Sequence, residues 1–413
     1  MNLKSIKNLD VAGKIALVRA GFDVPMRDGR ILNDFRIRVA IPTIEYLAKR
    51  GAKVVILAHL DRPEGWRESL SLAPAAKHLA EILRRKFVTV SEKEKNLPDY
   101  PVSHLFFFRH NIEKIDIRPL LAQMKEGDIA VLENIRFYPG ETEGDKKFAR
   151  MLASLGDCYV DEAFSDAHRK HASIIGVPQF LPSVPGFGFA RELDILERFM
   201  SHPKKPVVVM IGGIKITSKL EALRNLAKIS DYILLGGGLA SLFLKMAGYE
   251  IGKSVWEENS GNQKIAKELW RDFREKIYLP VDAVVSKSRD GKPSCVKIEK
   301  IRPGQMILDI GPETTLLFSK ILKKGRALLW NGPLGYVENR DFAHGTLALG
   351  RLFASRTKTD VSGIAGGGDT LEVIADLGME EFIDHLSTGG GAMLNFLAEK
   401  KLPALEKLTN EQS

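Results

Sequence analysis

The chain has 413 residues, of which 44% are hydrophobic, 8% aromatic and 27% charged. This length corresponds to two or three domains, and the composition excludes a fibrous or disordered protein. Lys and Arg number 61 against 52 Asp and Glu, which gives a formal net charge of +9 and favours anionic partners. The basic residues are spread along the chain rather than gathered in a stripe, so we expect no nucleic-acid partner.

Cysteine usage and hydropathy indicate the compartment. The two cysteines, Cys158 and Cys295, lie far apart and predict neither a disulfide scaffold nor a zinc site. Residues 1–14 lack an apolar signal segment, and the longest uncharged apolar stretch, residues 232–244, is too short to span a bilayer. We therefore expect a cytoplasmic protein that does not contact membranes.

In chain order, short β-branched runs alternate with helical patterns, which is typical of βαβ units that build a parallel sheet covered by helices. Each run is apolar enough for burial on both faces. The expected strands are Ile15–Arg19, Val54–Ala58, Ile129–Leu132 and Tyr159–Val160 in the first half, and Val207–Ile211, Tyr232–Leu235, Ala327–Leu329 and Gly363–Ala365 in the second.

Helix signals fall between these runs. Pro42 suits a first helical turn and Gly51 a position just past a helix end, while Ile41, Ile44 and Leu47 share one face between them and predict a core contact. A second helical pattern covers Glu192–Met200 and lies between the Pro- and Gly-rich segments 179–188 and 202–206. We therefore predict an α/β protein of two doubly wound, Rossmann-like lobes, 1–185 and 205–394, joined by a helix and hinge over 186–204.

The second half carries four glycine clusters after predicted strands. Glycines at a strand-to-helix turn let the backbone approach a ligand, and the helix start beyond them offers free N–H groups to phosphate. Any single cluster is explained by a tight turn, but four in one half favour a nucleotide, and neither a P-loop nor a complete GxGxxG motif is present. The clusters are Gly212-Gly213, Gly236-Gly237-Gly238, Gly366-Gly367-Gly368 and Gly389-Gly390-Gly391.

Three polar residues accompany these glycines. Asp369 is a candidate ligand for a magnesium ion that bridges nucleotide phosphates, although a lone Asp at this place is also a common helix N-cap. Lys215 and Lys219 are four residues apart after Gly212-Gly213, so on a helix both ammonium groups would point the same way and hold an anion. A solvated lysine face is the alternative.

The first half has a different inventory, in which basic residues lie at or near predicted strand ends. Arginine's rigid fork suits phosphate and carboxylate, so convergence of these side chains predicts a small, multiply anionic ligand, whereas scattered surface arginines are the alternative. Together with a nucleotide site, this inventory indicates phosphoryl transfer. The residues are Arg19, Arg36, His59, Arg62, Arg136, His168, Arg169 and His171.

These residues occur in segments that resemble the phosphoglycerate kinase family nearly from end to end. In the first half, the segment Arg19–Pro25 resembles RVDFNVP, His59–Pro63 resembles HLGRP, Leu132–Phe137 resembles LENVRF, and Val160–His171 resembles VNDAFGTAHRAH. In the second half, Gly212–Lys219 resembles GGAKVxDK, and Asp309–Pro312, Trp330–Gly335, Gly366–Thr370 and Ser387–Ala392 match family motifs closely.

The resemblance implies a two-lobed, hinge-bending and usually monomeric kinase of glycolysis. It would transfer a phosphoryl group between 1,3-bisphosphoglycerate and Mg-ADP, giving 3-phosphoglycerate and Mg-ATP, with the first lobe for phosphoglycerate and the second for nucleotide. The resemblance also implies that residues 395–413 pack back on the first lobe.

The resemblance carries site roles onto matching positions. Catalysis would fall to Arg36 and Lys215 with the backbone N–H groups of Gly368 and Gly391. Phosphoglycerate would be bound by Arg19, Asp23, Arg36, His59, Arg62, Arg136 and Arg169. The nucleotide would be bound by Gly212, Lys215, Lys219, Gly237, Asn331, Pro333, Glu338, Gly367, Gly368, Asp369 and Thr370, with Asp369 also holding Mg²⁺.

The chain departs from the family pattern mainly in the first half, where the changes make an anion-binding pocket less positive. Asp61 beside Arg62 is placed to pair with it and compete for phosphate. Three hypotheses therefore stay open: an ordinary phosphoglycerate kinase, a related enzyme with an altered acyl-phosphate substrate, or a non-catalytic nucleotide-binding homologue. The departures are Gly21 for Asp, Asp23 for Asn, Asp61 for Gly, Asp161-Glu162 for Asn-Asp, Ser165 for Gly, Ser218 for Asp and Asn395 for Glu.

Overall fold

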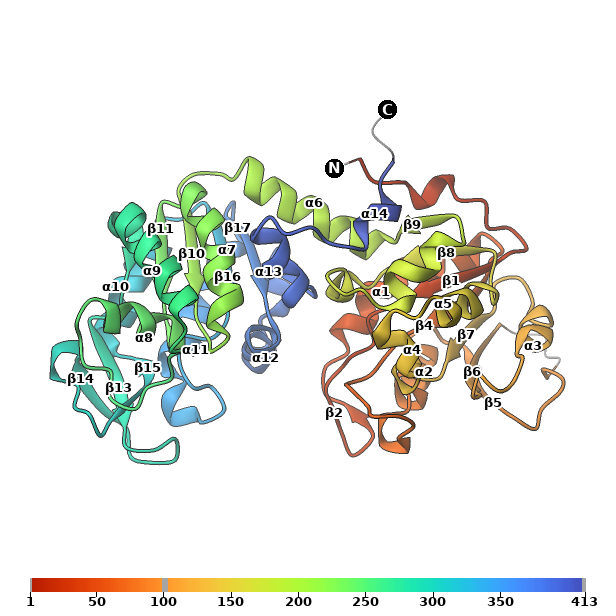
Figure 1. Cartoon of the computed structure of the whole chain (residues 1–413), viewed down its shortest axis with the longest axis horizontal. Coiled ribbons are helices and arrows are strands. Elements are labelled where there is room, and N and C mark those ends of the chain that lie inside the picture. The colour runs from red at the N-terminus through yellow and green to blue at the C-terminus, as the bar shows by residue number, and fades with distance from the viewer. Residues whose placement is uncertain (1, 99–102, 411–413) are drawn as a thin grey trace. The chain divides into compact units, whose positions relative to one another are not determined.

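The computed structural model describes residues 2–98 and 103–410. The chain divides into two compact units. Unit 1 runs up to Asp194 and also contains the segment from Leu402 onward, while unit 2 spans Ile195–Lys401. The boundary lies inside helix α6 (Phe187–Ser201), through which the chain passes from unit 1 to unit 2 (Figure 1).

Unit 1 is built on a seven-stranded parallel sheet with the strand order β5-β6-β7-β4-β1-β8-β9. The strands are β1 (Ile15–Arg19), β4 (Lys53–Leu57), β5 (Lys86–Ser91), β6 (His104–Arg109), β7 (Ile129–Leu132), β8 (Cys158–Asp161) and β9 (Ser183–Pro185). The antiparallel pair β2 (Met26–Arg27) and β3 (Arg30–Ile31) stands apart. The helices are α1 (Phe35–Lys49), α2 (Ala73–Ile82), α3 (Arg118–Ala122), α4 (Pro139–Glu143), α5 (Lys146–Ala153) and α14 (Leu405–Leu408).

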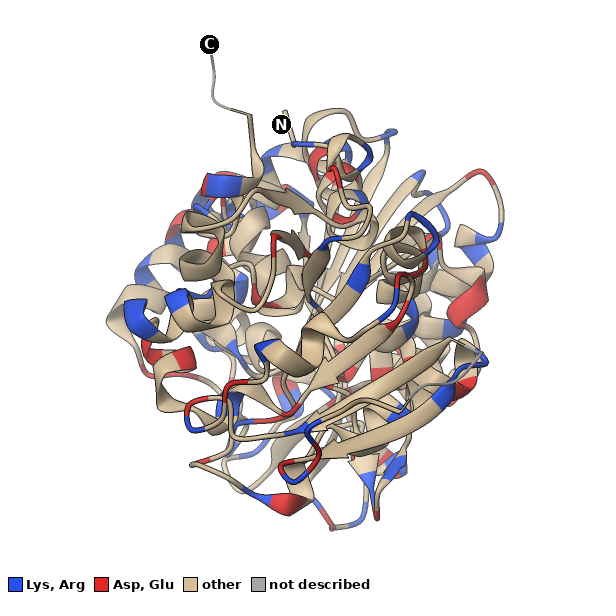
Figure 2. Cartoon of the chain, turned by 90° about the vertical axis from the view of Figure 1, so that its right-hand side faces the viewer, with Lys and Arg blue, Asp and Glu red and all other residues tan. Residues whose placement is uncertain are grey.

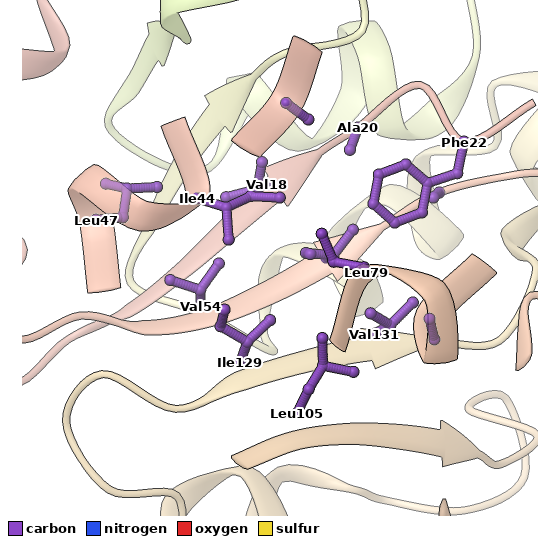
Figure 3. Close-up of a cluster of buried hydrophobic side chains, with 14 of the residues drawn as sticks. Val18, Ala20, Phe22, Ile44, Leu47, Val54, Leu79, Leu105, Ile129 and Val131 are labelled. Carbon is purple, nitrogen blue, oxygen red and sulfur yellow. The ribbon is translucent and has the colours of Figure 1, made fainter. Parts of the chain in front are cut away.

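Both faces of this sheet are buried, as the apolar runs predicted. Successive residues of a strand point to opposite faces, so Val18 joins one apolar cluster and Leu17 another. In the first cluster, Ile44 and Leu47 of α1 and Leu79 of α2 pack against strand residues (Figure 3). The predicted core face of α1 is therefore confirmed at Ile44 and Leu47, whereas Ile41 is only partly buried.

The expected start of α1 at Pro42 is wrong. The helix already begins at Phe35, whose N–H donates to the Asn33 side chain at 2.9 Å, so Pro42 lies inside it with its ring exposed. A proline removes one backbone donor from a helix interior, and here it does so on the solvent side. Gly51 follows the helix end with φ +81°, as expected for a residue just past a helix.

Unit 2 contains a six-stranded parallel sheet of order β12-β11-β10-β16-β17-β18 and a three-stranded antiparallel sheet of order β14-β13-β15. The parallel strands are β10 (Val207–Ile211), β11 (Tyr232–Leu235), β12 (Ile277–Tyr278), β16 (Ala327–Asn331), β17 (Ser362–Gly366) and β18 (His385–Ser387). The antiparallel ones are β13 (Asp282–Ser286), β14 (Ser294–Lys297) and β15 (Met306–Ile310). The helices are α7 (Ile216–Ile229), α8 (Gly237–Met246), α9 (Ser260–Phe273), α10 (Pro312–Leu322), α11 (His344–Thr357), α12 (Gly368–Leu377) and α13 (Gly391–Leu397).

The eight predicted strands all exist, within a residue or two of the expected bounds. The structure adds strands that were not predicted from the sequence, namely β5, β6, β9, β12 and β18 of the parallel sheets, the pair β2 and β3, and the whole three-stranded antiparallel sheet. The last segment of the chain contributes to unit 1, since Leu3 pairs with Thr409 and the Ala404 N–H donates to the Ala167 carbonyl at 3.2 Å.

The charged side chains are mixed in sign. Figure 2 shows Lys and Arg interspersed with Asp and Glu along the ribbons rather than gathered in one basic stripe. Among the described residues, no helix combines the length and apolar character that crossing a membrane needs.

Candidate functional site

The carboxyl ends of four neighbouring strands bring the basic residues of unit 1 together. β7, β4, β1 and β8 are adjacent and parallel, so they all end at the same edge of the sheet. The residues that follow these strands are far apart in sequence but meet at this edge, which is where ligands bind in open α/β sheets. They include Arg19, Asp23, His59, Arg62, Arg136 and Arg169.

Asp166 is the centre of the hydrogen-bond network at this edge. Its carboxylate accepts from Arg19 Nη2 and from Arg136 Nη2, each at 3.1 Å, and lies 3.5 Å from His59 Nδ1. Burial would raise the pKa of Asp166, but the guanidinium charges of Arg19 and Arg136 outweigh burial and hold that pKa well below its usual range. Asp166 is therefore a buried carboxylate that fixes two guanidinium groups.

Asp166 is not among the site residues predicted from the sequence. A signal was nevertheless available, because the family pattern VNDAFGTAHRAH has threonine at the position that Asp166 occupies. Its role depends on Arg19 and Arg136, which are distant in sequence and reach it only through the order of the strands.

Arg19 is fully buried and all its nitrogens have partners inside unit 1. Nε donates to Ser173 Oγ at 2.9 Å, Nη1 donates to the Ala20 carbonyl at 2.6 Å, and Nη2 lies 2.8 Å from His59 Nδ1 as well as contacting Asp166. In this structure Arg19 thus contacts protein groups rather than solvent.

The contact with Arg19 Nη2 defines the tautomer of His59. A guanidinium can only donate, so His59 Nδ1 accepts and the ring proton lies on Nε2, 3.9 Å from Asp23 Oδ2. Burial lowers the pKa of His59 to about 3, with Arg19 and Arg136 adding to the effect and Asp166 opposing it. His59 is therefore a neutral donor at physiological pH.

Asp23 forms a second centre beside the first. Arg36, in the first turn of α1, donates from Nη1 to the Asp23 carbonyl at 2.7 Å and lies 3.4 Å from Asp23 Oδ2. Asp23 Oδ1 accepts from the Asp61 N–H at 2.9 Å. The carboxylate at position 23 thus ties Arg36 to the loop after β4.

The expected side-chain pair of Asp61 and Arg62 is not formed. Asp61 Oδ1 instead accepts from the backbone N–H of Arg62 at 2.8 Å, and within the described residues the Arg62 guanidinium has no carboxylate partner. Asp61 has φ +56°, a left-handed conformation that glycine adopts without cost and that Asp tolerates better than most residues. The exposed Arg62 therefore remains available to an anion.

Two further departures, at the end of β8, are buried. Asp161 Oδ1 accepts from the Ala163 N–H at 2.9 Å, and burial raises the pKa of Asp161 to about 7. Glu162 accepts from Thr43 Oγ1 at 2.7 Å, and Thr43 Oγ1 in turn accepts from the Phe187 N–H at 2.8 Å. Glu162 thus links α1 to the start of α6 instead of facing the edge.

Several buried polar atoms at this edge lack a protein partner. Buried polar groups are nearly always hydrogen-bonded, so a concentration of exceptions indicates a place that a ligand or water occupies. Among the described residues, these atoms include Arg136 Nε, Asp161 Oδ2, His168 Nδ1 and Arg169 Nε.

In unit 2, the glycine turns follow adjacent strands of the parallel sheet. Gly212-Gly213 lies between β10 and α7, Gly236 between β11 and α8, and Gly332 just after β16. Gly367 precedes α12 and Gly390 precedes α13, so Gly368 and Gly391 are the first residues of helices. The glycine turns after β10, β11, β17 and β18 therefore lead into helices, as expected.

Lys219 lies at the centre of these turns. It is 6% exposed, and its Nζ donates to the Gly212 carbonyl. A Cβ on Gly213 would approach Lys219 Nζ to 2.6 Å and one on Gly332 to 2.2 Å, so glycine at both positions makes room for the ammonium. Burial lowers the pKa of Lys219 to about 8.

Lys215 differs from Lys219 in its surroundings. It is exposed and stands at the N-cap of α7, before the first helical residue, so the helical-spacing argument for a shared lysine face does not apply. Its side chain is therefore accessible to a ligand, whereas Lys219 is buried between the turns.

The remaining predicted residues of unit 2 fix the turns or face solvent. Thr370 Oγ1 accepts from the Gly332 N–H at 2.7 Å, and Asn331 Nδ2 donates to the Gly366 carbonyl at 2.8 Å. A Cβ on Gly212 would meet the Pro333 carbonyl at 2.1 Å, and the Gly237 N–H donates to the Leu334 carbonyl at 2.9 Å, so these loops are packed together. Glu338 lies further along the same loop and is exposed.

Asp369 is exposed in the first turn of α12, whose N-cap is Gly367, so the N-cap alternative for Asp369 is excluded. Within the described residues, no three His, Cys, Asp or Glu side chains are grouped to hold a metal ion. A single exposed carboxylate fits Mg²⁺, which takes few protein ligands and completes its shell with water and substrate phosphates.

Comparison with known proteins agrees with this arrangement. The family model described as phosphoglycerate kinase matches residues 6–400. A curated phosphoglycerate kinase of Dictyoglomus turgidum is 40% identical over 411 residues, covering 98% of both chains, and one of Aquifex aeolicus is 39% identical over 417 residues, covering 99% of both.

Solved structures are similar over the same length. Phosphoglycerate kinase from Coxiella burnetii is 33% identical with a TM-score of 0.78, covering 98% of this chain and 99% of that one. The enzyme from Pyrococcus horikoshii is 28% identical with a TM-score of 0.79, covering 98% of both chains. The chain therefore belongs to the phosphoglycerate kinase family.

Proposed function

We propose which residues of this chain bind each substrate and which assist phosphoryl transfer in the reaction of its family. The chain is a phosphotransferase with a carboxyl group as acceptor, which moves a phosphoryl group reversibly between 1,3-bisphosphoglycerate and ADP to give 3-phosphoglycerate and ATP. No observation favours an altered acyl-phosphate substrate or a non-catalytic homologue. Unit 1 binds the phosphoglycerate and unit 2 the nucleotide.

The phosphoglycerate site is the carboxyl edge of the unit 1 sheet. The observation that supports it is the concentration of cationic groups with unused donors, namely the exposed guanidinium of Arg62 and the unpartnered Nε atoms of Arg136 and Arg169. His59 adds a neutral Nε2–H donor, and Asp23 orients Arg36. Arg19 acts as a positioning residue, because its nitrogens are already occupied by protein partners.

The nucleotide site is the group of glycine turns in unit 2. Lys219, Asn331, Thr370 and the N–H groups at Gly367 and Gly368 serve the phosphates, while Gly212, Gly237, Pro333 and Glu338 line the adenosine. Asp369 would hold Mg²⁺, which when bound neutralises phosphate charge. The support is the buried ammonium of Lys219 between the turns and the helix starts of α12 and α13 beside it.

The chemistry asks little of the protein beyond position and charge. An acyl phosphate is already activated, so alignment of donor and acceptor and neutralisation of the equatorial phosphoryl oxygens suffice. Lys215 and Arg36 supply that charge, and the backbone N–H groups of Gly368 and Gly391 assist. Neither a covalent intermediate nor a strong general base is needed.

We predict that Lys215→Ala lowers kcat by about a hundredfold or more, since one charged donor to the transition state is lost. Coupled formation of 1,3-bisphosphoglycerate from 3-phosphoglycerate and Mg-ATP measures kcat, and the unaltered enzyme should turn over on the order of 10–1,000 times per second. Mg-ATP affinity, measured by calorimetry, should stay within a factor of a few because Lys219 remains.

The matched control is Lys264→Ala, which removes the same charge from an exposed position on α9 and should leave both quantities unchanged. Equal losses of turnover and nucleotide affinity in Lys215→Ala would contradict the role proposed for Lys215. We also propose that the enzyme is cytoplasmic and monomeric. Light scattering of the purified protein tests its oligomeric state.

A further inference from the structure

The hydroxyl of Ser165 lies at the phosphoglycerate edge, beside a glycine. Ser165 belongs to the turn η4 (Phe164–Asp166) after β8, and Gly21 follows the neighbouring parallel strand β1. A Cβ placed on Gly21 would lie 3.4 Å from Ser165 Oγ and within 4 Å of no other non-adjacent atom. Gly21 has no positive φ, so its backbone does not require glycine; glycine leaves the space beside Ser165 open.

The turn that carries Ser165 is held firmly. The next residue, Asp166, is fixed by Arg19 and Arg136, its N–H donates to the Ala163 carbonyl at 2.9 Å, and its carbonyl accepts from the Arg169 N–H at 2.7 Å. Ser165 is half-buried, and within the described residues its hydroxyl forms no hydrogen bond. A hydroxyl with free donor and acceptor capacity therefore stands on a fixed turn at this edge.

The chemistry of the substrate assigns a partner to this hydroxyl. A phosphoglycerate carries a phosphate, a carboxyl group and one uncharged hydroxyl. Arginines suit the two anionic groups, whereas a hydroxyl needs a group that accepts or donates a single hydrogen bond.

The nearby side-chain oxygens at this edge contact protein groups or are fully buried. Asp23 Oδ1 accepts from the Asp61 N–H and Oδ2 lies against Arg36. Ser173 is fully buried and bonds Arg19 and Glu141, while Asp161 is fully buried.

We propose that Ser165 Oγ binds the hydroxyl of the phosphoglycerate, and that the open space left by Gly21 admits it. Ser165 is then a specificity-determining residue that distinguishes the hydroxylated substrate from an analogue without the hydroxyl. This proposal rests on the assignment of phosphoglycerate to unit 1.

The test compares two acceptors in the coupled assay with Mg-ATP. One is 3-phosphoglycerate, and the other is 3-phosphooxypropanoate, which keeps the phosphate and the carboxylate but lacks the hydroxyl. The unaltered enzyme should prefer 3-phosphoglycerate, and Ser165→Ala should reduce this preference in kcat/KM by about tenfold, the value of one neutral hydrogen bond. The KM for Mg-ATP should not change.

A second variant tests the same contact by filling the space beside Ser165. Gly21→Ala places a methyl group 3.4 Å from Ser165 Oγ, so it should raise the KM for 3-phosphoglycerate more than that for the analogue. The matched control is Ser154→Ala, which removes an exposed hydroxyl of unit 1 and should leave the preference intact.

The outcomes distinguish failure of the role proposed for Ser165 from failure of the assignment of phosphoglycerate to unit 1. An equal loss on both acceptors in Ser165→Ala, or no change in their ratio, would overturn the role of Ser165 while leaving the kinase reaction in place. Absence of turnover in the unaltered enzyme, with neither acceptor protecting unit 1 from unfolding, would instead overturn the assignment of phosphoglycerate to unit 1 and the inference with it.

Discussion

At the scale of single residues, charge at the carboxyl edge of the unit 1 sheet is balanced inside the protein. Asp166 neutralises part of the charge of Arg19 and Arg136, and Asp23 does the same for Arg36. These carboxylates do more than weaken the attraction of the edge for anions, because each also fixes the guanidinium it contacts. The departures of this chain from the family pattern thus exchange some positive potential for fixed geometry.

Asp161 provides a pH-dependent test at this scale. Its folded-state pKa of about 7 lies above the value of about 3.9 expected in the unfolded chain, so the folded state keeps a proton that the unfolded state releases between these limits. Stability is therefore lost as pH rises through this window. We predict that Asp161→Asn raises the free energy of unfolding of unit 1 more at pH 8 than at pH 5. The difference between the two effects should be on the order of 2 kcal/mol.

Urea unfolding followed by the fluorescence of Trp66, the one tryptophan of unit 1, measures this difference at the two pH values. Asp28→Asn is the control, since it removes an exposed carboxylate from the turn between β2 and β3 and should show no such pH dependence. A stability gain that is the same at pH 5 and pH 8 would exclude burial of the Asp161 charge as its cause.

At the scale of elements, the sites depend on where parallel strands end and helices begin. The strands predicted from apolar runs are those of the sheet interiors, such as β1 and β10, because burial on both faces gives them a continuous hydrophobic sequence. The missed strands include β5, an edge strand with only partial burial, and β18, with three residues. β5 carries a weaker signal because few of its side chains are buried, and β18 because it is short. β6 was also missed, although it is an interior strand with a buried apolar run.

The link between α1 and α6 is testable as an element contact. Thr43→Val keeps the shape of the side chain but removes the hydroxyl that joins Glu162 to the Phe187 N–H. Two buried polar groups then lose a partner, so we predict a loss of about 1–3 kcal/mol in the stability of unit 1. Thr142→Val, at an exposed position, is the comparison variant in the same urea experiment. An unchanged unfolding midpoint in Thr43→Val would show that this link does not support α6.

At the scale of the whole molecule, each unit has its own core, and the chain passes between them through α6. A ligand stabilises the unit that binds it, so hydrogen exchange should locate the two ligands separately. We predict that 3-phosphoglycerate slows exchange around the ends of β1 and β8, and that Mg-ADP slows it at the starts of α7 and α12.

Glycerate at the same concentration, which lacks the phosphate, is the control for the first ligand and should protect little. Protection by 3-phosphoglycerate confined to unit 2, or by Mg-ADP confined to unit 1, would reverse the assignment of ligands to units.

The sequence by itself determined the α/β class, most of the interior strands, the glycine turns and the family, because these depend on local composition and on motifs that are contiguous in the chain. Only the tertiary structure identified Asp166 as the centre of the network at the carboxyl edge of the unit 1 sheet. The same is true of the buried state of Arg19, the tautomer of His59 and the place of Ser165 beside Gly21. Those features depend on which strands are neighbours and on burial. Both arise from contacts between residues 30 to 154 positions apart, which no local pattern encodes.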